Sequence, residues 1–259
     1  MTTTIYDRFN KQIASDTRWS ARLTLSDKNT YLVYVDTCSF EKIADKENTA
    51  LVLAGNGQLI AEWKDWWYNS MDTNNLPVTD VAGQNEVNLM IIDKINNEIL
   101  FDAGQKKAIF CTDTSTALSI FAGSGDVHAA SCWHANRCVQ TAITTASEKD
   151  YFTSNVIKYV DFTTGQSNLG KPDCSYANII SEMLDKGFIM NMTNSTAAND
   201  VGTPISQHQI NEEVKELLAS GKAVASAPVP GLSEFKWNDA NKQKLINAID
   251  RVKELETKA

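Results

Sequence analysis

The sequence predicts an α+β protein in which antiparallel sheets carry helices on their outer faces. Three observations support this fold class. Short apolar segments bounded by turn residues come in consecutive pairs, as strands of antiparallel sheets do. Two segments with apolar residues at helical spacing interrupt these strands. The 259 residues are 42% apolar and 22% charged, which is enough to bury a large core without disulfides or metals.

The predicted strands are joined by short polar turns. Turn residues at Asn10-Lys11, at 27–29 and at Asn96-Asn97 separate segments rich in apolar residues. An apolar run at 50–54 stops at Gly55, which is typical of a buried strand. The expected strands are residues 2–9, 12–18, 20–25, 30–36, 50–54, 87–92, 98–101, 107–111, 117–122 and 150–162.

Two helices are predicted between these strands. From 58 to 68, apolar residues recur at three- and four-residue spacing and would cover one face of a sheet. Residues 126–148 are predicted to form one long helix, with Asp126 placed to cap it. The polar segment 69–86, with Pro77 inside it, is predicted to be a loop.

After residue 168 the pattern of paired strands ends. We therefore expect a first domain at 2–168 and a mostly helical C-terminal extension at 169–259. Asn238 would cap the last helix, whose apolar residues share one face. The extension is expected to hold helices at 175–188, 209–219 and 239–257, a loop at 191–204 and a linker near 222–233.

Charge and composition exclude several classes of protein. With 24 basic and 32 acidic residues the net charge is −8, so nucleic acid is not an expected partner. No apolar run approaches the length of a membrane span, and no membrane partner is expected. The N-terminus lacks the pattern of a signal peptide, and the five cysteines are an odd number. These features favour a cytoplasmic protein with free thiols.

No cofactor and no metal is expected. Two glycine-rich turns, near residues 55 and 123, each lack the third glycine of a dinucleotide-binding loop. His128 with Cys132, and His134 with Cys138, have the i,i+4 spacing of metal ligands on a helix. The two pairs begin six residues apart, however, and so face different sides of the predicted helix.

The strongest chemical signal is the start of the chain. Thr2 follows Met1, and a small residue at position two generally permits removal of the methionine. Thr2 would then carry a hydroxyl and a free α-amine on one residue. The ordinary pKa of an α-amine, about 7.7–8.0, lets it act as a base for its own hydroxyl near neutral pH. The alternative is that residues 2–5 merely begin a strand.

Six segments occur in an order that matches one known family. They are Thr2-Thr3-Thr4-Ile5, Ala14-Ser15-Asp16-Thr17-Arg18, Phe40-Glu41-Lys42-Ile43, Leu53-Ala54-Gly55-Asn56-Gly57, Phe121-Ala122-Gly123-Ser124-Gly125 and Asp150-Tyr151-Phe152-Thr153. Together they resemble the proteasome β-type family of N-terminal nucleophile (Ntn) hydrolases. That family includes the bacterial two-component protease HslV, and the layout is most similar to its phage- and prophage-encoded members. The resemblance implies a four-layer αββα sandwich of two antiparallel sheets for residues 2–168.

The resemblance also implies roles for individual residues. Thr2 would be the nucleophile, and Lys42, held by Asp16, would lower the pKa of its amine and hydroxyl. Asp16 lies fourteen positions after Thr2, two fewer than the resemblance implies, and the removal of two residues from a hairpin would keep both side chains on one side. The Gly55 N–H would stabilise the oxyanion. The residues expected to orient the Thr2 amine are Ser124, Asp150 and Thr153, and those expected to bind substrate are Leu53 and Thr17.

The expected function is that of a threonine-type peptidase without a cofactor. Two alternatives remain open at this point. One is a catalytically inactive proteasome-like assembly protein that uses Trp63, Trp66 and the extension as interfaces. The other is a non-peptide amidase with the same N-terminal chemistry. The resemblance implies peptides or unfolded proteins as substrates, a homo-oligomer that is possibly a ring, and possibly an ATPase unfoldase as partner.

Overall fold

The computed structural model describes residues 2–104, 106–193, 201–231 and 234–257. It is a mixed α+β protein, as the sequence predicts, and the described residues form two main sheets and six α-helices. The strand pairs of both sheets are antiparallel. A small separate hairpin, β7 (Asp80–Val81) with β8 (Gln84–Asn85), lies inside the segment that was predicted to be a loop.

The five-stranded sheet is built around the N-terminal hairpin. Its order is β11 (Lys107–Phe110), β12 (Ala117–Gly123), β1 (Thr3–Asp7), β2 (Gln12–Asp16) and β13 (Ile157–Asp161). The predicted turn at Asn10-Lys11 is confirmed. The Asp7 carboxylate fastens it by accepting from the Asn10 backbone N–H at 3.0 Å and from the Asn10 side chain at 2.8 Å.

The nine-stranded sheet takes strands from both ends of the chain. Its order is β10 (Glu98–Ala103), β9 (Val87–Asp93), β6 (Thr49–Asn56), β16 (Ser226–Ala227), β3 (Trp19–Thr24), β4 (Thr30–Val35), β14 (Phe188–Asn191) and β15 (Thr203–Pro204), and β5 (Ile43–Asp45) also pairs with β6. The hairpins predicted from the sequence at β3–β4 and β9–β10 are confirmed.

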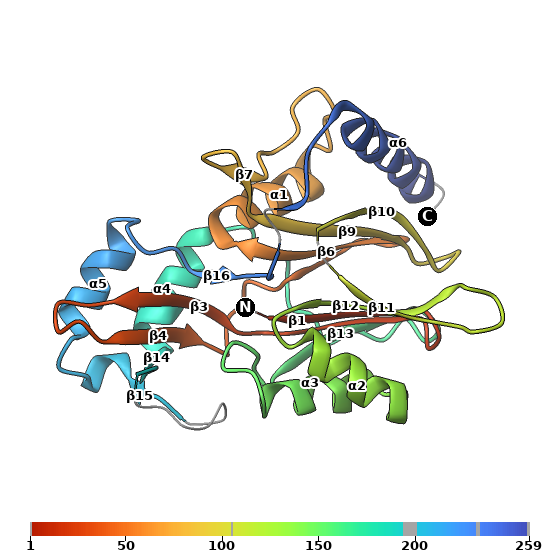
Figure 1. Cartoon of the computed structure of the whole chain (residues 1–259). Coiled ribbons are helices and arrows are strands. Elements are labelled where there is room, and N and C mark those ends of the chain that lie inside the picture. Colours follow the sequence, from red (N-terminus) through yellow and green to blue (C-terminus); the bar gives the residue numbers. More distant parts are fainter. Residues whose placement is uncertain (1, 105, 194–200, 232–233, 258–259) are drawn as a thin grey trace.

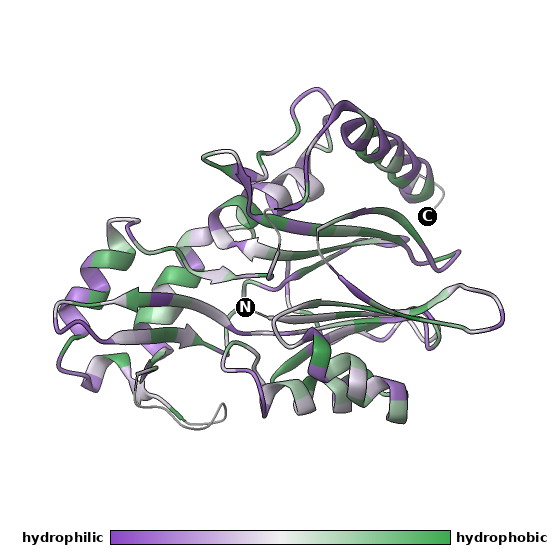
Figure 2. Ribbon diagram, in the orientation of Figure 1, coloured by the Kyte–Doolittle hydropathy of each residue, from purple (hydrophilic) through white to green (hydrophobic). Residues whose placement is uncertain are grey.

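The two sheets face each other over part of their area, as Figure 1 shows. Apolar side chains from both sheets meet there in one buried cluster. Tyr6 and Ile13 come from the five-stranded sheet, and Val52, Met90 and Ile92 come from the nine-stranded one. Figure 2 shows that the strands are predominantly hydrophobic where the sheets meet, whereas α6 also carries many hydrophilic residues.

The helices cover the outer faces of the sheets. On the five-stranded sheet, α2 (Asp126–Asn136) and α3 (Val139–Ser147) bury a cluster that includes Trp133 and Ile143. On the nine-stranded sheet, α1 (Gly57–Asn69) buries its tryptophans Trp63 and Trp67. The helices α4 (Tyr176–Lys186), α5 (Asn211–Ala219) and α6 (Asp239–Glu256), with the short 3-10 helix Ile205–Gln207, join the same core cluster.

The predicted long helix at 126–148 is wrong, because the chain breaks into α2 and α3. Arg137 adopts a left-handed conformation with φ 52°, and Cys138 is extended. The Arg137 carbonyl accepts from the Asn10 side chain at 2.8 Å, and its guanidinium lies 4.4 Å from the Trp133 ring centre. These tertiary contacts outweigh the local preference for a continuous helix. The N-cap residue of α2 is Gly125, which makes no side-chain capping hydrogen bond, and Asp126 is the first helical residue, so the predicted cap was placed one residue too late.

The segment from residue 169 onward contributes strands as well as helices. Both β14 and β15 extend the nine-stranded sheet beyond β4, and β16 lies within the predicted linker near 222–233. The last helix is confirmed: Asn238 caps α6 by accepting from the Asn241 N–H at 2.9 Å. Part of the predicted loop at 191–204, residues 194–200, lies outside the described residues. None of the helices in the described part of the chain has the length and apolar character needed to cross a membrane.

Candidate functional site

The Asp16 carboxylate lies at the end of β2, beside the start of β1. Its Oδ1 accepts hydrogen bonds from the Thr2 hydroxyl and, at 2.8 Å, from the Thr3 N–H. The register pairs Thr4 with Ser15, so its continuation sets Asp16 opposite Thr3 and not on the side of Thr2. The parity argument was therefore wrong, and the carboxylate reaches both threonines because it sits where the strand pair ends.

Lys42 shares this carboxylate with Thr2. Its Nζ lies 3.0 Å from Asp16 Oδ1 and donates to the Asp16 backbone carbonyl at 2.9 Å, and both side chains are fully buried. Burial lowers the pKa of Lys42, and the attraction of Asp16 opposes this shift. The structure therefore brings Thr2, Asp16 and Lys42 together, as the sequence predicts.

The second carboxylate oxygen of Asp16 is also held. It accepts from the Arg18 N–H at 2.9 Å and from the Ser154 N–H at 3.2 Å. The Arg18 side chain makes a two-bond ion pair with Asp36, with both N···O distances at 2.7 Å, and its guanidinium lies 4.0 Å from the Tyr34 ring centre. Three backbone N–H groups, the Thr2 hydroxyl and one ammonium thus fix the orientation of Asp16.

A second polar cluster lies on the other side of the chain start. Asp150 Oδ2 accepts from the Ser124 hydroxyl and from the Thr153 hydroxyl at 2.6 Å. The Thr153 hydroxyl in turn lies 2.9 Å from the Thr3 hydroxyl. The three residues predicted to orient the Thr2 amine are therefore together, and their hydrogen bonds extend to Thr3.

Glycines allow these two clusters to meet. Gly123 has φ +110°, and a Cβ there would lie 1.7 Å from the Thr2 carbonyl oxygen. A Cβ on Gly125 would lie 2.2 Å from the Thr3 hydroxyl oxygen. The backbone of this turn can pass against residues 2 and 3 only because it has no side chains at these two points.

Gly55 is the second-last residue of β6 and lies two residues before the start of α1. It has φ +124°, and the atom that a Cβ would strike is the Glu86 carbonyl oxygen, at 1.9 Å. The following residue, Asn56, caps α1 by accepting from the N–H groups of Gln58 and Leu59. Gly55 thus lies just before the N-cap of α1, near a helix N-terminus, which favours negative charge.

The two predicted substrate-binding residues occupy different environments. Leu53 on β6 has no exposed surface and belongs to the large core cluster under α1. Its N–H donates to the Lys42 carbonyl at 2.8 Å, which fixes Lys42 against β6. Thr17 is nearly buried, and its hydroxyl lies 3.0 Å from the Ser154 hydroxyl.

Sequence reasoning missed two residues of this arrangement. Thr3 donates its N–H to Asp16 and places its hydroxyl against Thr153, so it links the two clusters. Ser154 contacts Asp16 and Thr17. The available signal was their position: each directly follows a predicted site residue along the chain.

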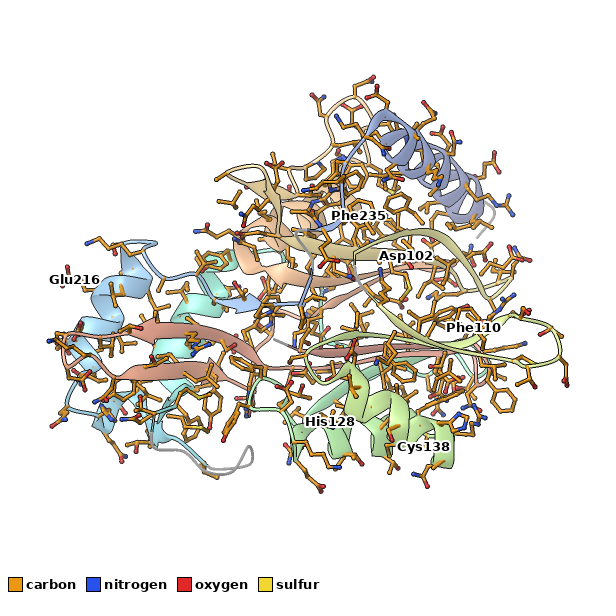
Figure 3. All side chains as sticks on the ribbon, viewed as in Figure 1. Asp102, Phe110, His128, Cys138, Glu216 and Phe235 are labelled. Carbon is orange, nitrogen blue, oxygen red and sulfur yellow. The ribbon has the colours of Figure 1, made fainter. Side chains whose placement is uncertain are left out.

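The histidine and cysteine pairs lie apart from this site. His128 is on α2 and Cys138 directly precedes α3, both in the helical layer outside the five-stranded sheet (Figure 3). The helix break at Arg137 separates His134 from Cys138, so the second pair does not share a helix. In the described part of the chain, no three His, Cys, Asp or Glu side chains gather in the manner of a metal site.

The site therefore combines the Thr2 hydroxyl, the Asp16 carboxylate and the Lys42 ammonium in a buried setting. A second carboxylate, Asp150, is connected to Thr3 through the Thr153 hydroxyl. Such a set can hold a threonine oxygen as a nucleophile and control its proton. The sequence matches neither a family model nor a curated protein.

Proposed function

We propose that this chain is a threonine-type peptidase of the Ntn-hydrolase class. The proposal includes the four-layer αββα sandwich for residues 2–168. The observation that carries it is the Thr2 hydroxyl on the buried Asp16–Lys42 pair. A plain strand start does not account for a fully buried ammonium and carboxylate placed against the second residue of the chain, since burial of such charges is unfavourable unless they are paired and hydrogen-bonded.

Removal of Met1 would give Thr2 a free α-amine. The amine takes the hydroxyl proton as Thr2 Oγ attacks the carbonyl carbon of a peptide bond. The Gly55 N–H stabilises the oxyanion of the tetrahedral intermediate. The C–N bond breaks, the amine passes its proton to the leaving nitrogen, and water then hydrolyses the Thr2 ester to release the acid.

The two clusters divide the work of positioning. The Asp16–Lys42 pair supports the Thr2 hydroxyl, and the Lys42 charge favours loss of its proton. The Ser124–Asp150–Thr153 network contacts Thr3 and so fixes the backbone that carries the Thr2 amine. In this proposal the substrate is a peptide or an unfolded protein, the chain forms a homo-oligomer, and an ATPase unfoldase is a possible partner.

The proposal is tested with a peptide epoxyketone, which reacts with the amine and hydroxyl of an N-terminal threonine together. Intact mass should show loss of Met1 and one bound probe per chain. Thr2→Ala should lower labelling and peptide cleavage by about 10³-fold or more, because it removes the hydroxyl that attacks the carbonyl carbon and leaves only the α-amine. Thr2→Ser keeps the hydroxyl and should retain labelling, and Thr4→Ser serves as a matched control.

Two results would redirect the assignment. Retention of Met1 without labelling would favour the non-catalytic assembly protein. Labelling of Thr2 without cleavage of any peptide would favour the non-peptide amidase.

A further inference from the structure

A short C-terminal strand fills the space between β3 and the end of β6, beyond the part of β6 that pairs with β5. Ser226 pairs with Ser20 on β3 and with Asn56 on β6, and Ala227 pairs with Gly55. The two-residue strand β16 is the link between the β6 side and the β3 side of the nine-stranded sheet, as Figure 1 shows. An extended segment laid between two edges is the arrangement in which sheet proteins bind peptides.

The register of β16 places one carbonyl beside the candidate oxyanion donor. The Gly57 N–H donates to the Ala225 carbonyl at 3.1 Å, whereas the Asn56 N–H points the other way, to Glu86 at 2.9 Å. The next residue of β6 that faces β16 is therefore Gly55, opposite Ala227. Since Pro228 has no N–H, Gly55 and Ala227 form the hydrogen-bonding pair, and the Ala227 carbonyl occupies the Gly55 N–H.

The cleft is shaped to this segment. A Cβ on Gly57 would lie 2.3 Å from the Ala225 carbonyl oxygen, so this glycine allows the close approach. The Tyr176 hydroxyl accepts from the Ala225 N–H at 2.9 Å. The small side chains of Ala225 and Ala227 are fully buried in the core cluster that also contains Leu53.

The rest of the cleft remains open alongside the strand. A cavity of about 420 Å³ is lined by Ser20, Gly55, Phe152, Ser226 and Pro228 among others. Ser226 and Pro228 are half-buried and face this cavity, whereas their neighbours in the strand point into the core. Alternate side chains of the segment thus point into the protein core and toward the cavity, as the side chains of a bound extended peptide do.

We propose that residues 225–228 are an internal pseudosubstrate that closes the catalytic cleft. This inference rests on the proposed function. The segment withholds the Gly55 N–H and the backbone of Ser20 from substrates, and Thr2 has no exposed surface while the segment is in place. The ligand that replaces it is an extended peptide with small side chains at the positions of Ala225 and Ala227.

Two variants of the full chain should open the cleft. Gly57→Ala adds a Cβ against the Ala225 carbonyl, and Ser226→Pro removes an N–H from the strand that pairs with β3. Each should raise the rates of epoxyketone labelling and peptide cleavage by about tenfold, which corresponds to about 1.4 kcal/mol. Gly170→Ala is the matched control, because its Cβ would meet an ordinary contact at 3.7 Å and the rate should stay that of the wild type.

A reversible lock tests the same inference in the opposite direction. Ser20 and Ser226 are direct cross-strand partners, and the Cα separation of such partners, about 5 Å, suits a disulfide. Oxidised Ser20→Cys/Ser226→Cys protein should lose labelling, and reduction should restore it. The two single-cysteine variants, treated in the same way, control for the five native thiols.

The outcomes separate the inference from the proposed function. Labelling of Thr2 at equal rates in wild-type, opened and locked protein would overturn the pseudosubstrate and leave the peptidase standing. Hydrogen exchange at the Gly55 amide, which should become faster in the opened variants, shows that the segment has left. An opened cleft with an unreactive Thr2 in every variant would overturn both. Recovery of a fragment that ends at Ala227 would show a true substrate and overturn the inhibitory role.

Discussion

Two buried lysines near each other differ in their partners: one is paired with a carboxylate and the other is hydrogen-bonded to a backbone carbonyl. Lys42 and Lys64 are each 1% exposed. Lys42 directly follows Glu41 in the chain, and Lys64 contacts the Glu41 backbone. Lys42 forms an ion pair with Asp16 at 3.0 Å. Lys64 on α1 donates to the Glu41 carbonyl at 2.9 Å and lies 3.9 Å from the Phe40 ring centre. Burial of an ammonium therefore does not by itself mark a site; the buried carboxylate and the threonine beside Lys42 do.

The pKa of Lys64 expresses this difference. Burial lowers it to about 8, and the weaker attractions of Cys174, Asp173 and Glu41 only partly oppose the shift. Asp16 is in direct contact with Lys42, whereas Cys174, Asp173 and Glu41 act on Lys64 as nearby charges. Burial thus lowers the pKa of both lysines, but only Lys42 has a buried carboxylate in direct contact that opposes the shift.

The largest effect should come from breaking the buried pair. Asp16→Asn keeps the shape of the side chain and removes the charge, so Lys42 is left uncompensated. We expect a loss of about 3–5 kcal/mol in the free energy of unfolding, measured by urea titration. The double variant Asp16→Asn/Lys42→Met should recover part of that loss. Additive effects of the two substitutions would contradict the coupling.

A smaller effect should distinguish Lys64 by its pH dependence. Between pH 8 and the ordinary lysine pKa, the unfolded chain binds a proton at Lys64 that the folded chain has released. The stability of the folded state must therefore rise with pH in this window. From the pKa of about 8, the contribution of Lys64 should grow by about 2 kcal/mol between pH 7 and pH 9.5.

Urea titrations at these two pH values check this expectation. Lys64→Met should lack the rise, and the difference between the wild type and the variant removes the contribution of other groups. Because Lys64 lies outside the proposed catalytic machinery, epoxyketone labelling should persist in this variant. An unchanged slope in Lys64→Met would show that Lys64 keeps its ordinary pKa.

The smallest effect should come from the partly exposed pair next to the site. Arg18 and Asp36 have side chains that are 10% and 25% exposed, so solvent screens their attraction. Asp36→Asn should lower the free energy of unfolding by about 1 kcal/mol or less at neutral pH. A loss as large as that of Asp16→Asn would show that Arg18 acts as part of the same buried network.

The local parts of this fold could be predicted from the sequence. Alternating patterns and turn residues located both N-terminal hairpin strands, and the spacing of Trp63 and Trp67 located α1. The contact of Thr2, Asp16 and Lys42 was predicted from the resemblance of the motifs and their order to a known family, although the parity argument for Asp16 was wrong.

Features that depend on distant contacts could not be predicted. The strand β16 pairs with residues about 170 positions earlier on β6 and about 206 positions earlier on β3. The prolines after it suggested a linker, since proline is rare inside a sheet. The break before α3 contains no glycine or proline that would predict it from the sequence. Arg137 takes the left-handed conformation there, where it contacts Asn10 and Trp133. The hydrogen bond between the Thr3 and Thr153 hydroxyls joins residues that are 150 positions apart, so the sequence could not predict it.

The place of β16 also governs how the protein can be synthesised. A ribosome delivers β3 and β6 early, but the strand that belongs between them emerges only when the chain is nearly complete. Until then the nascent protein carries an open edge at β3 and at the end of β6, and open edges are templates for unwanted association. A message truncated before codon 226 would therefore leave a product whose largest sheet is never joined at its centre.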